Sequence, residues 1–193
     1  MAEKFQAIII TGPPGSGKGT QAEKLATIGK YFRISTGEML RNFDPTTTLG
    51  LQIKKLIDSG KFVSDKLTID LLEVTIKKYI SKGLFKPKEQ ILILDGAPRT
   101  LNQIKLIEKF IEIRQIITLE SKEDILIKRL IQRAKLEGRA DDQDINIIKK
   151  RFEDYKKETI PILSGYPKDK IIYIDASSRI EDVYKSILEK LVM

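Results

Sequence analysis

The sequence predicts an α/β protein in which a five-stranded parallel sheet is covered by helices on both faces. Short apolar segments of strand length alternate along the chain with longer segments whose apolar residues recur at helical spacing. The strand-like segments, such as 5–11 and 90–94, are almost entirely apolar, which is typical of parallel strands buried on both faces. A glycine-rich turn at 12–19 joins the first apolar segment to the first helical one. In such sheets ligands bind beyond the carboxyl ends of the strands, so we expect the functional site there.

Each element follows from its local pattern. We expect strands at 5–11, 31–34, 90–94, 115–119 and 170–174. We expect helices at 18–29, 100–111, 123–137, 144–163 and 179–191. The stretch 36–81 is expected to be mostly helical, with breaks at Asp44-Pro45 and at Gly60.

Size and composition point to a single domain. The chain has 193 residues, 41% of them apolar, which allows one compact core with small mobile regions. No apolar run approaches the roughly 18 residues of a membrane span. The first residues lack the basic and long apolar regions of a signal peptide, so we expect a cytoplasmic protein that does not bind membranes. Cysteine and histidine are both absent, which excludes disulfides and leads us to expect no zinc site.

The formal net charge of +8 is compatible with binding nucleic acid, anionic lipid or phosphorylated small molecules. It is also compatible with lysines that simply cover solvated helix faces. The lysines are scattered, and no run of roughly 4–8 basic residues marks a nucleic-acid or lipid surface. The net charge therefore does not decide among these readings.

The turn at 12–19 has the composition of a phosphate-binding loop. Its glycines let the backbone curl so that N–H groups point at an anion, and the following helix adds the positive end of its dipole. The spacing G-x-x-x-x-G-K places Lys18 within reach of the outer phosphates of a nucleotide. Gly19 stands where the general motif has the Ser or Thr that holds magnesium, and a hydroxyl appears one residue later, at Thr20.

From Gly12 to Gln21 the chain reads GPPGSGKGTQ, which resembles the phosphate loop of nucleoside monophosphate kinases. The resemblance to the adenylate kinase family continues along essentially the whole chain. The matching segments are ISTGEMLR at 34–41, GKFVSD at 60–65, DGAPRT at 95–100 with Gln103, and GRADD at 138–142, followed by Arg151, Tyr155, Thr159 and Pro161. The resemblance implies a P-loop fold in which a core (1–35, 66–132 and 140–193) carries a small helical lobe for the nucleoside monophosphate (36–65) and a short lid (133–139).

The resemblance implies an enzyme that transfers a phosphoryl group reversibly between Mg²⁺-ATP and AMP, giving two ADP. Transfer of this kind needs two nucleotides held in line and negative charge neutralised, which arginine does well because its planar fork holds phosphate oxygens. The implied catalytic residues are Lys18, Asp95, Arg99, Arg133, Arg139 and Arg151. The implied ATP-binding residues are Gly15, Ser16, Gly17, Lys18, Gly19, Thr20, Arg129, Arg133 and Arg179. The implied AMP-binding residues are Thr36, Gly37, Arg41, Lys61, Val63, Gly96, Arg99, Gln103, Arg139 and Arg151.

The implied roles are specific. Asp95 would hold magnesium through bound waters, and the flat guanidinium of Arg129 would lie against the ATP adenine, opposite the turn 178–180. Gln103 would pair with the adenine of AMP. We expect no side-chain base, because the acceptor is already a phosphate anion. We also expect a monomer that binds no nucleic acid.

The chain departs from the family pattern at two places, and its lid resembles the short form found within the family. Ala97 replaces the usual Phe, which removes an apolar contact from the acceptor side. The spacing from Asp141 to Arg151 is one residue longer than the commonest one, and we expect the slack to be absorbed before the helix begins. Only Ala-Lys-Leu-Glu-Gly separates Arg133 from Arg139, too few residues for the β domain of long-lid relatives.

Three other functions compete with this one. A UMP/CMP kinase shares the loop, the lobe and the short lid, but such enzymes tend to carry Asn where this chain has Thr100 and Gln103. A non-catalytic binding module of the same fold would be expected to have lost residues such as Lys18 and Arg99, which are present. A nucleic-acid-binding role has only the net charge in its favour.

Overall fold

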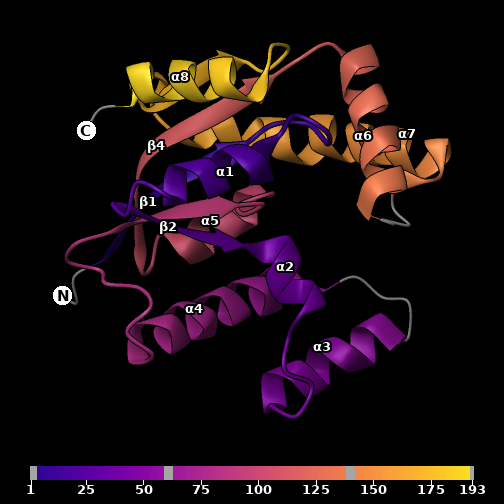
Figure 1. Ribbon diagram of the computed structural model, residues 1–193. Coiled ribbons are helices and arrows are strands. Elements are labelled where there is room, and N and C mark those ends of the chain that lie inside the picture. The colour runs from indigo at the N-terminus through magenta and orange to yellow at the C-terminus, as the bar shows by residue number, and fades with distance from the viewer. Residues whose placement is uncertain (1–3, 59–62, 138–141, 192–193) are drawn as a thin grey trace.

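The computed structural model describes residues 4–58, 63–137 and 142–191, and it confirms the five-stranded parallel sheet (Figure 1). The order across the sheet is β2-β3-β1-β4-β5, and every neighbouring pair is parallel. The strands are β1 (Phe5–Thr11), β2 (Tyr31–Ser35), β3 (Ile91–Asp95), β4 (Ile111–Glu120) and β5 (Ile171–Asp175). The central position of β1 places the glycine-rich loop that follows it at the middle of one edge of the sheet.

Helices connect the strands. They are α1 (Lys18–Ala26), α2 (Thr36–Arg41), α3 (Thr48–Asp58), α4 (Asp65–Ser81), α5 (Leu101–Ile107), α6 (Glu123–Glu137), α7 (Ile145–Asp154) and α8 (Ile180–Lys190). The helix expected at 18–29 ends at Ala26, and the strand expected at 115–119 begins at Ile111. Two other helices end well before their expected residues. The helix expected at 100–111 ends at Ile107, because the apolar residues that follow it pair with β1 as the first part of β4. The helix expected at 144–163 ends at Asp154 and continues as a π-helical and then a 3₁₀ segment, where Pro161 has no N–H for an α-helical ladder.

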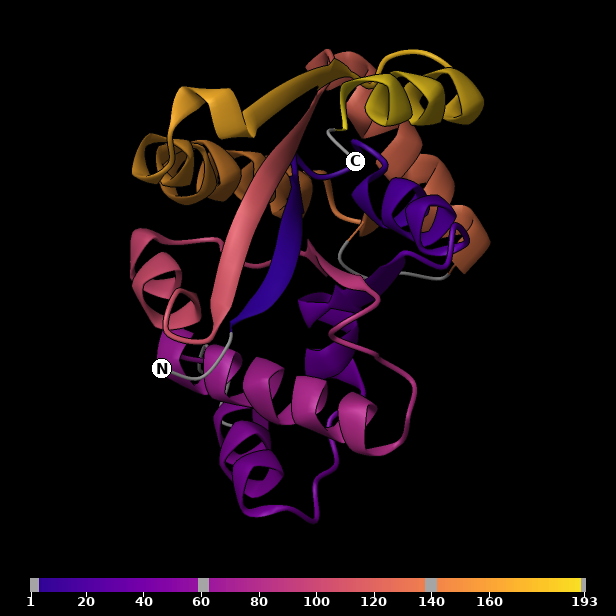
Figure 2. The same cartoon turned by 90° about the vertical axis from the view of Figure 1, so that its left-hand side faces the viewer.

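Alternation along β1 divides the core between the two faces of the sheet. Ala7 and Ile9 belong to a large buried cluster with residues of α4 and α5, whereas Ile8 and Ile10 belong to a cluster with residues of α1 and α8. Successive strand residues point to opposite faces, so a strand buried on both sides must be apolar throughout. Figure 2 shows the sheet with α4 below it and α8 above it.

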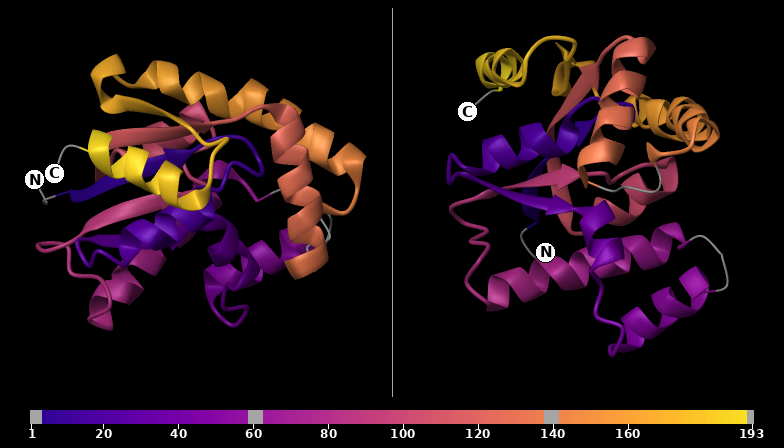
Figure 3. Two further views of the ribbon diagram at one scale, coloured as in Figure 1. Left: turned by 45° about the horizontal axis from the view of Figure 1, so that its top comes forward. Right: turned by 45° about the vertical axis from the view of Figure 1, so that its right-hand side comes forward.

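Two helical parts extend from this core. α3 packs against α4 at the lower end of the molecule, and α6 with α7 forms an arm above α3 on the same side (Figure 3). The arm has its own small apolar cluster, made by Leu126 and Leu130 of α6 with Ile148 and Phe152 of α7. None of the helices in the described part of the chain is both long and apolar enough to cross a membrane.

Candidate active site

The loop after β1 folds around Lys18. The Lys18 Nζ donates hydrogen bonds to the carbonyl oxygens of Gly12 at 2.8 Å and Pro13 at 2.9 Å, so the ammonium lies inside its own loop. Gly17, at φ 88°, adopts a left-handed conformation that favours glycine and immediately precedes α1. The Ser16 hydroxyl is buried, with no hydrogen-bond partner in the protein. A curled loop with an inward lysine and an unpaired hydroxyl at a helix N-terminus is suited to binding phosphate.

Burial lowers the pKa of Lys18 to about 7, against the partly compensating charge of Asp95. Three arginines, Arg99, Arg133 and Arg151, lower this pKa further by repulsion. Their influence means that cations from the loop after β3, from α6 and from α7 converge on the lysine of the phosphate loop. A bound polyphosphate would reverse this effect, because its negative charge stabilises the ammonium.

Asp95 is the last residue of β3 and is 8% exposed. Its Oδ2 accepts a hydrogen bond from Arg33 Nη2 at 2.8 Å, and Arg33 also forms ion pairs with Glu38 and Glu23. A Cβ built on Gly19 would lie 3.6 Å from Arg33 Nη2 and 3.7 Å from Asp95 Oδ2. The absence of a side chain at Gly19 therefore leaves space between the phosphate loop and the carboxylate.

This arrangement fits magnesium bound mainly through phosphates and water. Among the described residues no group of three acidic side chains could hold a metal by itself. Magnesium commonly keeps several waters and takes one or two carboxylates together with substrate phosphates. Asp95, facing the space beside Gly19, could supply such a carboxylate.

A buried carboxylate fixes two of the predicted catalytic arginines. Asp142, 1% exposed, accepts a hydrogen bond from Arg133 Nε at 2.6 Å on one oxygen and from Arg151 Nη1 at 2.5 Å on the other. Arg133 comes from α6 and Arg151 from α7, so the carboxylate joins both helices of the arm. The turn before α7, where Asp144 caps the helix by accepting from Asn146 N, precedes Arg151. Where the extra residue before Arg151 is accommodated stays a prediction.

The predicted acceptor residues meet at the end of β3. A Cβ built on Gly96 would lie 2.7 Å from Thr36 Oγ1 and 3.3 Å from Arg99 Nη2, so only glycine leaves room for both. The Arg41 guanidinium lies over Gly37, with Nη1 3.3 Å from a Cβ built there. The structure thus brings together two arginines, a hydroxyl and backbone N–H groups at the start of α2.

The pKa of Arg99 is lowered first by partial removal from water, although the residue as a whole remains exposed. Arg151 and Arg41 lower it further, while Asp95 acts in the opposite direction. Arginine stays charged at any physiological pH, so these neighbours leave Arg99 as an under-neutralised cation. An anion such as a phosphate would be attracted to this position.

A cavity of about 390 Å³ lies between the phosphate loop, α6 and the start of α8. Seven of the predicted ATP-binding residues line this cavity: Gly15, Ser16, Gly17, Thr20, Arg129, Arg133 and Arg179. Arg129 donates to the carbonyl oxygens of Ala176 at 2.7 Å, Ser177 at 3.3 Å and Ser178 at 3.1 Å, which fixes its guanidinium plane. The lining also includes Leu136, 78% exposed, as an apolar surface suited to a base.

The Gln103 side chain is 6% exposed and is hydrogen-bonded at both ends. Its Nε2 donates to Asp65 Oδ1 at 2.8 Å, and its Oε1 accepts from the backbone N–H of Arg99 at 2.7 Å. Val63, another predicted acceptor residue, is half-buried against the main apolar cluster. Ala97 is buried in that same cluster, so its small side chain is enclosed by apolar neighbours.

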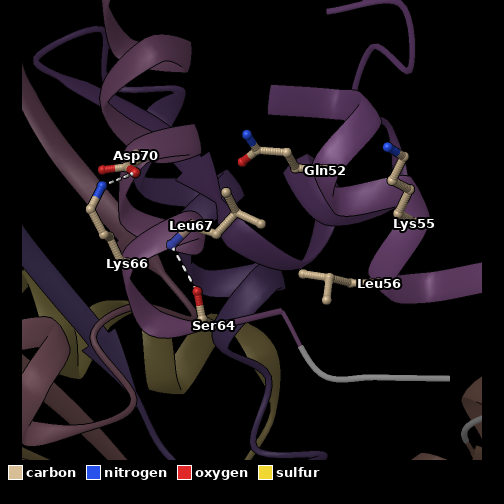
Figure 4. A pocket seen from close by; sticks show the side chains of 7 residues that line it. All are labelled: Gln52, Lys55, Leu56, Ser64, Lys66, Leu67 and Asp70. Carbon is tan, nitrogen blue, oxygen red and sulfur yellow. Dashed lines mark hydrogen bonds and ion pairs between the residues drawn. The ribbon is translucent and has the colours of Figure 1, made fainter. Parts of the chain in front are cut away.

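A second cavity, of about 570 Å³, lies between α3 and the first turns of α4 (Figure 4). It is lined by Gln52, Lys55, Leu56, Ser64, Lys66, Leu67 and Asp70, none of which is a predicted site residue. Within it Lys66 Nζ and Asp70 Oδ2 form an ion pair at 2.6 Å, as Figure 4 shows.

Two predicted residues, Lys61 and Arg139, lie outside the described residues. Three residues with a clear place in the site were given no role by the sequence: Arg33, Asp65 and Asp142. Arg33 carries a usable signal, because an arginine inside the otherwise apolar segment YFRIS must find a partner when the strand is buried. Asp65 and Asp142 lie within segments that match the family, but nothing in the sequence says what they hold.

A phosphate loop, a carboxylate at the end of the neighbouring strand and arginines from both sides meet where a transferring phosphoryl group needs its charge neutralised. The fold and the site define a P-loop phosphotransferase of the nucleoside monophosphate kinase type.

Comparison with known proteins identifies the family. A family model described as adenylate kinase matches residues 10–171. The adenylate kinase of Flavobacterium johnsoniae is 37% identical over 184 residues, covering 91% of this chain and 93% of the relative. That of a Synechococcus strain is 36% identical over 187 residues, 93% of each chain. The uridylate kinase of Saccharomyces cerevisiae is 32% identical over 193 residues, 98% of this chain and 92% of the relative. The chain belongs to the adenylate kinase family.

The lowered pKa of Lys18 predicts proton uptake when a nucleoside triphosphate binds. In the free protein the lysine is largely neutral above about pH 7, and bound phosphate raises its pKa, so binding takes up a proton. Affinity should be constant below about pH 7 and fall above it, by at most about tenfold per pH unit. Calorimetry at about pH 8 in two buffers of different ionisation enthalpy should detect uptake approaching one proton. Lys18→Arg, permanently charged, should remove most of it, and equal uptake by this variant would contradict the assignment.

The shared carboxylate of Asp142 predicts that Arg151 cannot be replaced by lysine. A guanidinium can donate to Asp142 and still present other N–H groups to a phosphate. A lysine carries all its donors on one nitrogen at the end of a shorter side chain, so it cannot reach both partners in the same way. Arg151→Lys should lower kcat by about 100-fold or more with little change in the unfolding midpoint. A Lys variant with nearly full activity would show that Arg151 does not face the reacting phosphates.

Proposed function

We propose that the chain catalyses the reversible, direct in-line transfer of a phosphoryl group from ATP to AMP, giving two ADP. The observation that carries the proposal is the placement of arginines on two sides of the phosphate loop. Arg99 lies beside Gly96 on the acceptor side, and Asp142 holds Arg133 and Arg151 together in the arm. All three arginines lower the pKa of Lys18. Cations on both sides of Lys18 can neutralise the negative charge of a phosphoryl group while it moves from one nucleotide to the other. Membership of the adenylate kinase family supports the same reaction.

The protein's part in the reaction is positioning and charge neutralisation. Lys18 would exchange its contacts with Gly12 and Pro13 for the phosphates of ATP. Arg41 and Arg99 would hold the phosphate of AMP, and Arg133, Arg139 and Arg151 would surround the transferred group. No side-chain base is required, since the attacking oxygen belongs to a phosphate that is already ionised.

Asp95 would hold magnesium through bound waters, in the space beside Gly19. Magnesium would neutralise charge on the ATP phosphates. The ion pair with Arg33 restrains Asp95 so that its carboxylate stays directed at this space.

The donor base is proposed to lie in the cavity beside Arg129, opposite the turn that carries Arg179. Carbonyl oxygens hold the edge of the Arg129 guanidinium and leave its face available for stacking. The acceptor base is proposed to pair with Gln103. Its carboxamide has two N–H donors and two lone pairs, and only one of each is used by Asp65 and Arg99.

A uridylate kinase is also among the relatives, so transfer to UMP or CMP is a second candidate function. Thr100 and Gln103 favour AMP, since a Gln carboxamide offers a donor and an acceptor that match N1 and the 6-amino group of adenine. We further propose that the protein acts as a cytoplasmic monomer in adenine nucleotide homeostasis and nucleotide biosynthesis, and binds no nucleic acid.

The acceptor preference can be measured directly. A coupled assay with ATP should show kcat/KM for AMP at least about tenfold above that for UMP or CMP, because uracil leaves a buried amide group unpaired. Lys18→Ala, with normal circular dichroism, should abolish transfer to all three acceptors and exclude a contaminating kinase. Equal or better turnover of UMP or CMP by the unaltered protein would favour the pyrimidine function.

We propose that 36–65 is a lobe that closes on the acceptor and 133–139 a lid that closes on the donor. α3 packs on α4 rather than on the sheet, and the arm has its own small apolar cluster, so both parts can move against the core. Two adenosines joined through five phosphates should occupy both nucleotide sites and slow amide hydrogen exchange in both segments. Unchanged exchange in both segments would rule out closure.

A further inference from the structure

One carboxylate organises the start of α5. Asp65, the first residue of α4, accepts hydrogen bonds from Thr100 Oγ1 at 2.9 Å and Asn102 Nδ2 at 3.1 Å on Oδ2, and from Gln103 Nε2 at 2.8 Å on Oδ1. All three donors lie within four consecutive residues, from Thr100 to Gln103. The contact joins the helix after the proposed acceptor lobe to the loop that carries Arg99.

Helix capping does not account for Asp65. The N-cap of α4 is Ser64, whose hydroxyl accepts from Leu67 N at 3.3 Å. The N-cap of α5 is Thr100, whose hydroxyl accepts from Gln103 N at 3.1 Å. Both helix starts therefore have their own side-chain caps. The carboxylate of Asp65 instead accepts hydrogen bonds from the side chains of Thr100, Asn102 and Gln103.

The carboxylate fixes which way the Gln103 amide faces. A carboxylate only accepts hydrogen bonds, so Nε2 must face Asp65, and Oε1 then accepts from the Arg99 N–H. Turning the amide by 180° would set oxygen against carboxylate and NH₂ against N–H. Both contacts would be repulsive, so Asp65 and Arg99 hold one orientation together.

The fixed orientation has a chemical consequence for a base. It leaves Gln103 with one N–H and one lone pair in a set order. Adenine offers a complementary acceptor at N1 and donor at its 6-amino group. Hypoxanthine has nearly the same shape but offers a donor at N1 and an acceptor at O6, which is the reverse order.

We propose that Asp65 is a specificity-determining positioning residue, which locks the Gln103 amide in the orientation that accepts adenine and rejects hypoxanthine. The inference rests on the proposed function, in which Gln103 pairs with the base of AMP. Asp65 itself touches no substrate. It acts by disfavouring the orientation in which the Gln103 amide is turned by 180°, because that orientation would match hypoxanthine.

The experiment compares AMP with inosine monophosphate as acceptors for ATP. In Asp65→Asn, the amide oxygen can still take the donors of Thr100 and Asn102, which turns NH₂ toward Gln103 and removes the preference for its native orientation. The ratio of kcat/KM for AMP to that for inosine monophosphate should fall by at least about tenfold, while KM for ATP stays within about twofold. Asp65→Ser, which offers no second acceptor oxygen, should lower the ratio in the same direction.

Two further variants separate the possible outcomes. Asp70→Asn removes a carboxylate from the same helix, paired with Lys66, and should keep the ratio of the unaltered protein. Gln103→Met removes the amide while keeping an extended side chain. If Gln103→Met keeps the original ratio, Gln103 does not read the base, and both the acceptor assignment and the inference fail. If Gln103→Met lowers the ratio and both Asp65 variants keep it, Gln103 reads the base and the role of Asp65 is wrong.

A measurement on the unaltered protein avoids any dependence on folding of the variants. In the nucleotide-free protein, nuclear magnetic resonance should show two resolved Gln103 side-chain amide protons, one of them slow to exchange with water because it is bonded to Asp65. Rapid exchange of both protons, at the rate of exposed glutamines, would overturn the lock.

Discussion

Repulsion among cations is the constraint on which the site depends. Lys18 and several arginines are gathered at one edge of the sheet, where they have no phosphate to neutralise them until a nucleotide binds. Two buried carboxylates make this possible: Asp142 holds Arg133 and Arg151, and Asp95 lies against Arg33 and acts favourably on Lys18. Removing one partner from such a cluster would leave an uncompensated buried charge, which is costly. The anion site is therefore kept open by acidic groups that do not themselves bind the anion.

The parallel sheet makes this gathering possible with few residues. Because β3 and β2 both lie on one side of β1, the residues that follow them, Gly96 and Thr36, meet beside the phosphate loop. The arm adds a second wall from the other side of β1, where β4 leads into α6. Short connections at the carboxyl ends thus bring residues from distant parts of the sequence around one point.

Most of the fold could be predicted because apolar periodicity reports burial directly. The strand segments and the parallel sheet follow from it, whereas the phosphate loop follows from its glycine-rich motif. The start of β4 was misplaced because the alternation in IEIRQ is compatible with either a helix end or a strand edge. In the site, Arg133 and Arg151 could be proposed from resemblance, but their common partner Asp142 could not, since a pairing between α6 and α7 depends on how the two helices pack. The hydrogen bond from Gln103 to Asp65 could not be predicted from the sequence either, because the two residues are 38 positions apart.

The arm formed by α6 and α7 has a consequence for heat inactivation. Its buried apolar cluster of Leu126, Leu130, Ile148 and Phe152 is separate from the two clusters that hold the sheet. Small clusters open locally at lower free energy than the main core of a protein. Because this arm carries Arg133 and Arg151, warming can separate the pair of arginines while the sheet remains folded. Catalytic turnover would then fade at temperatures at which the sheet itself, and the circular dichroism that it produces, is still intact.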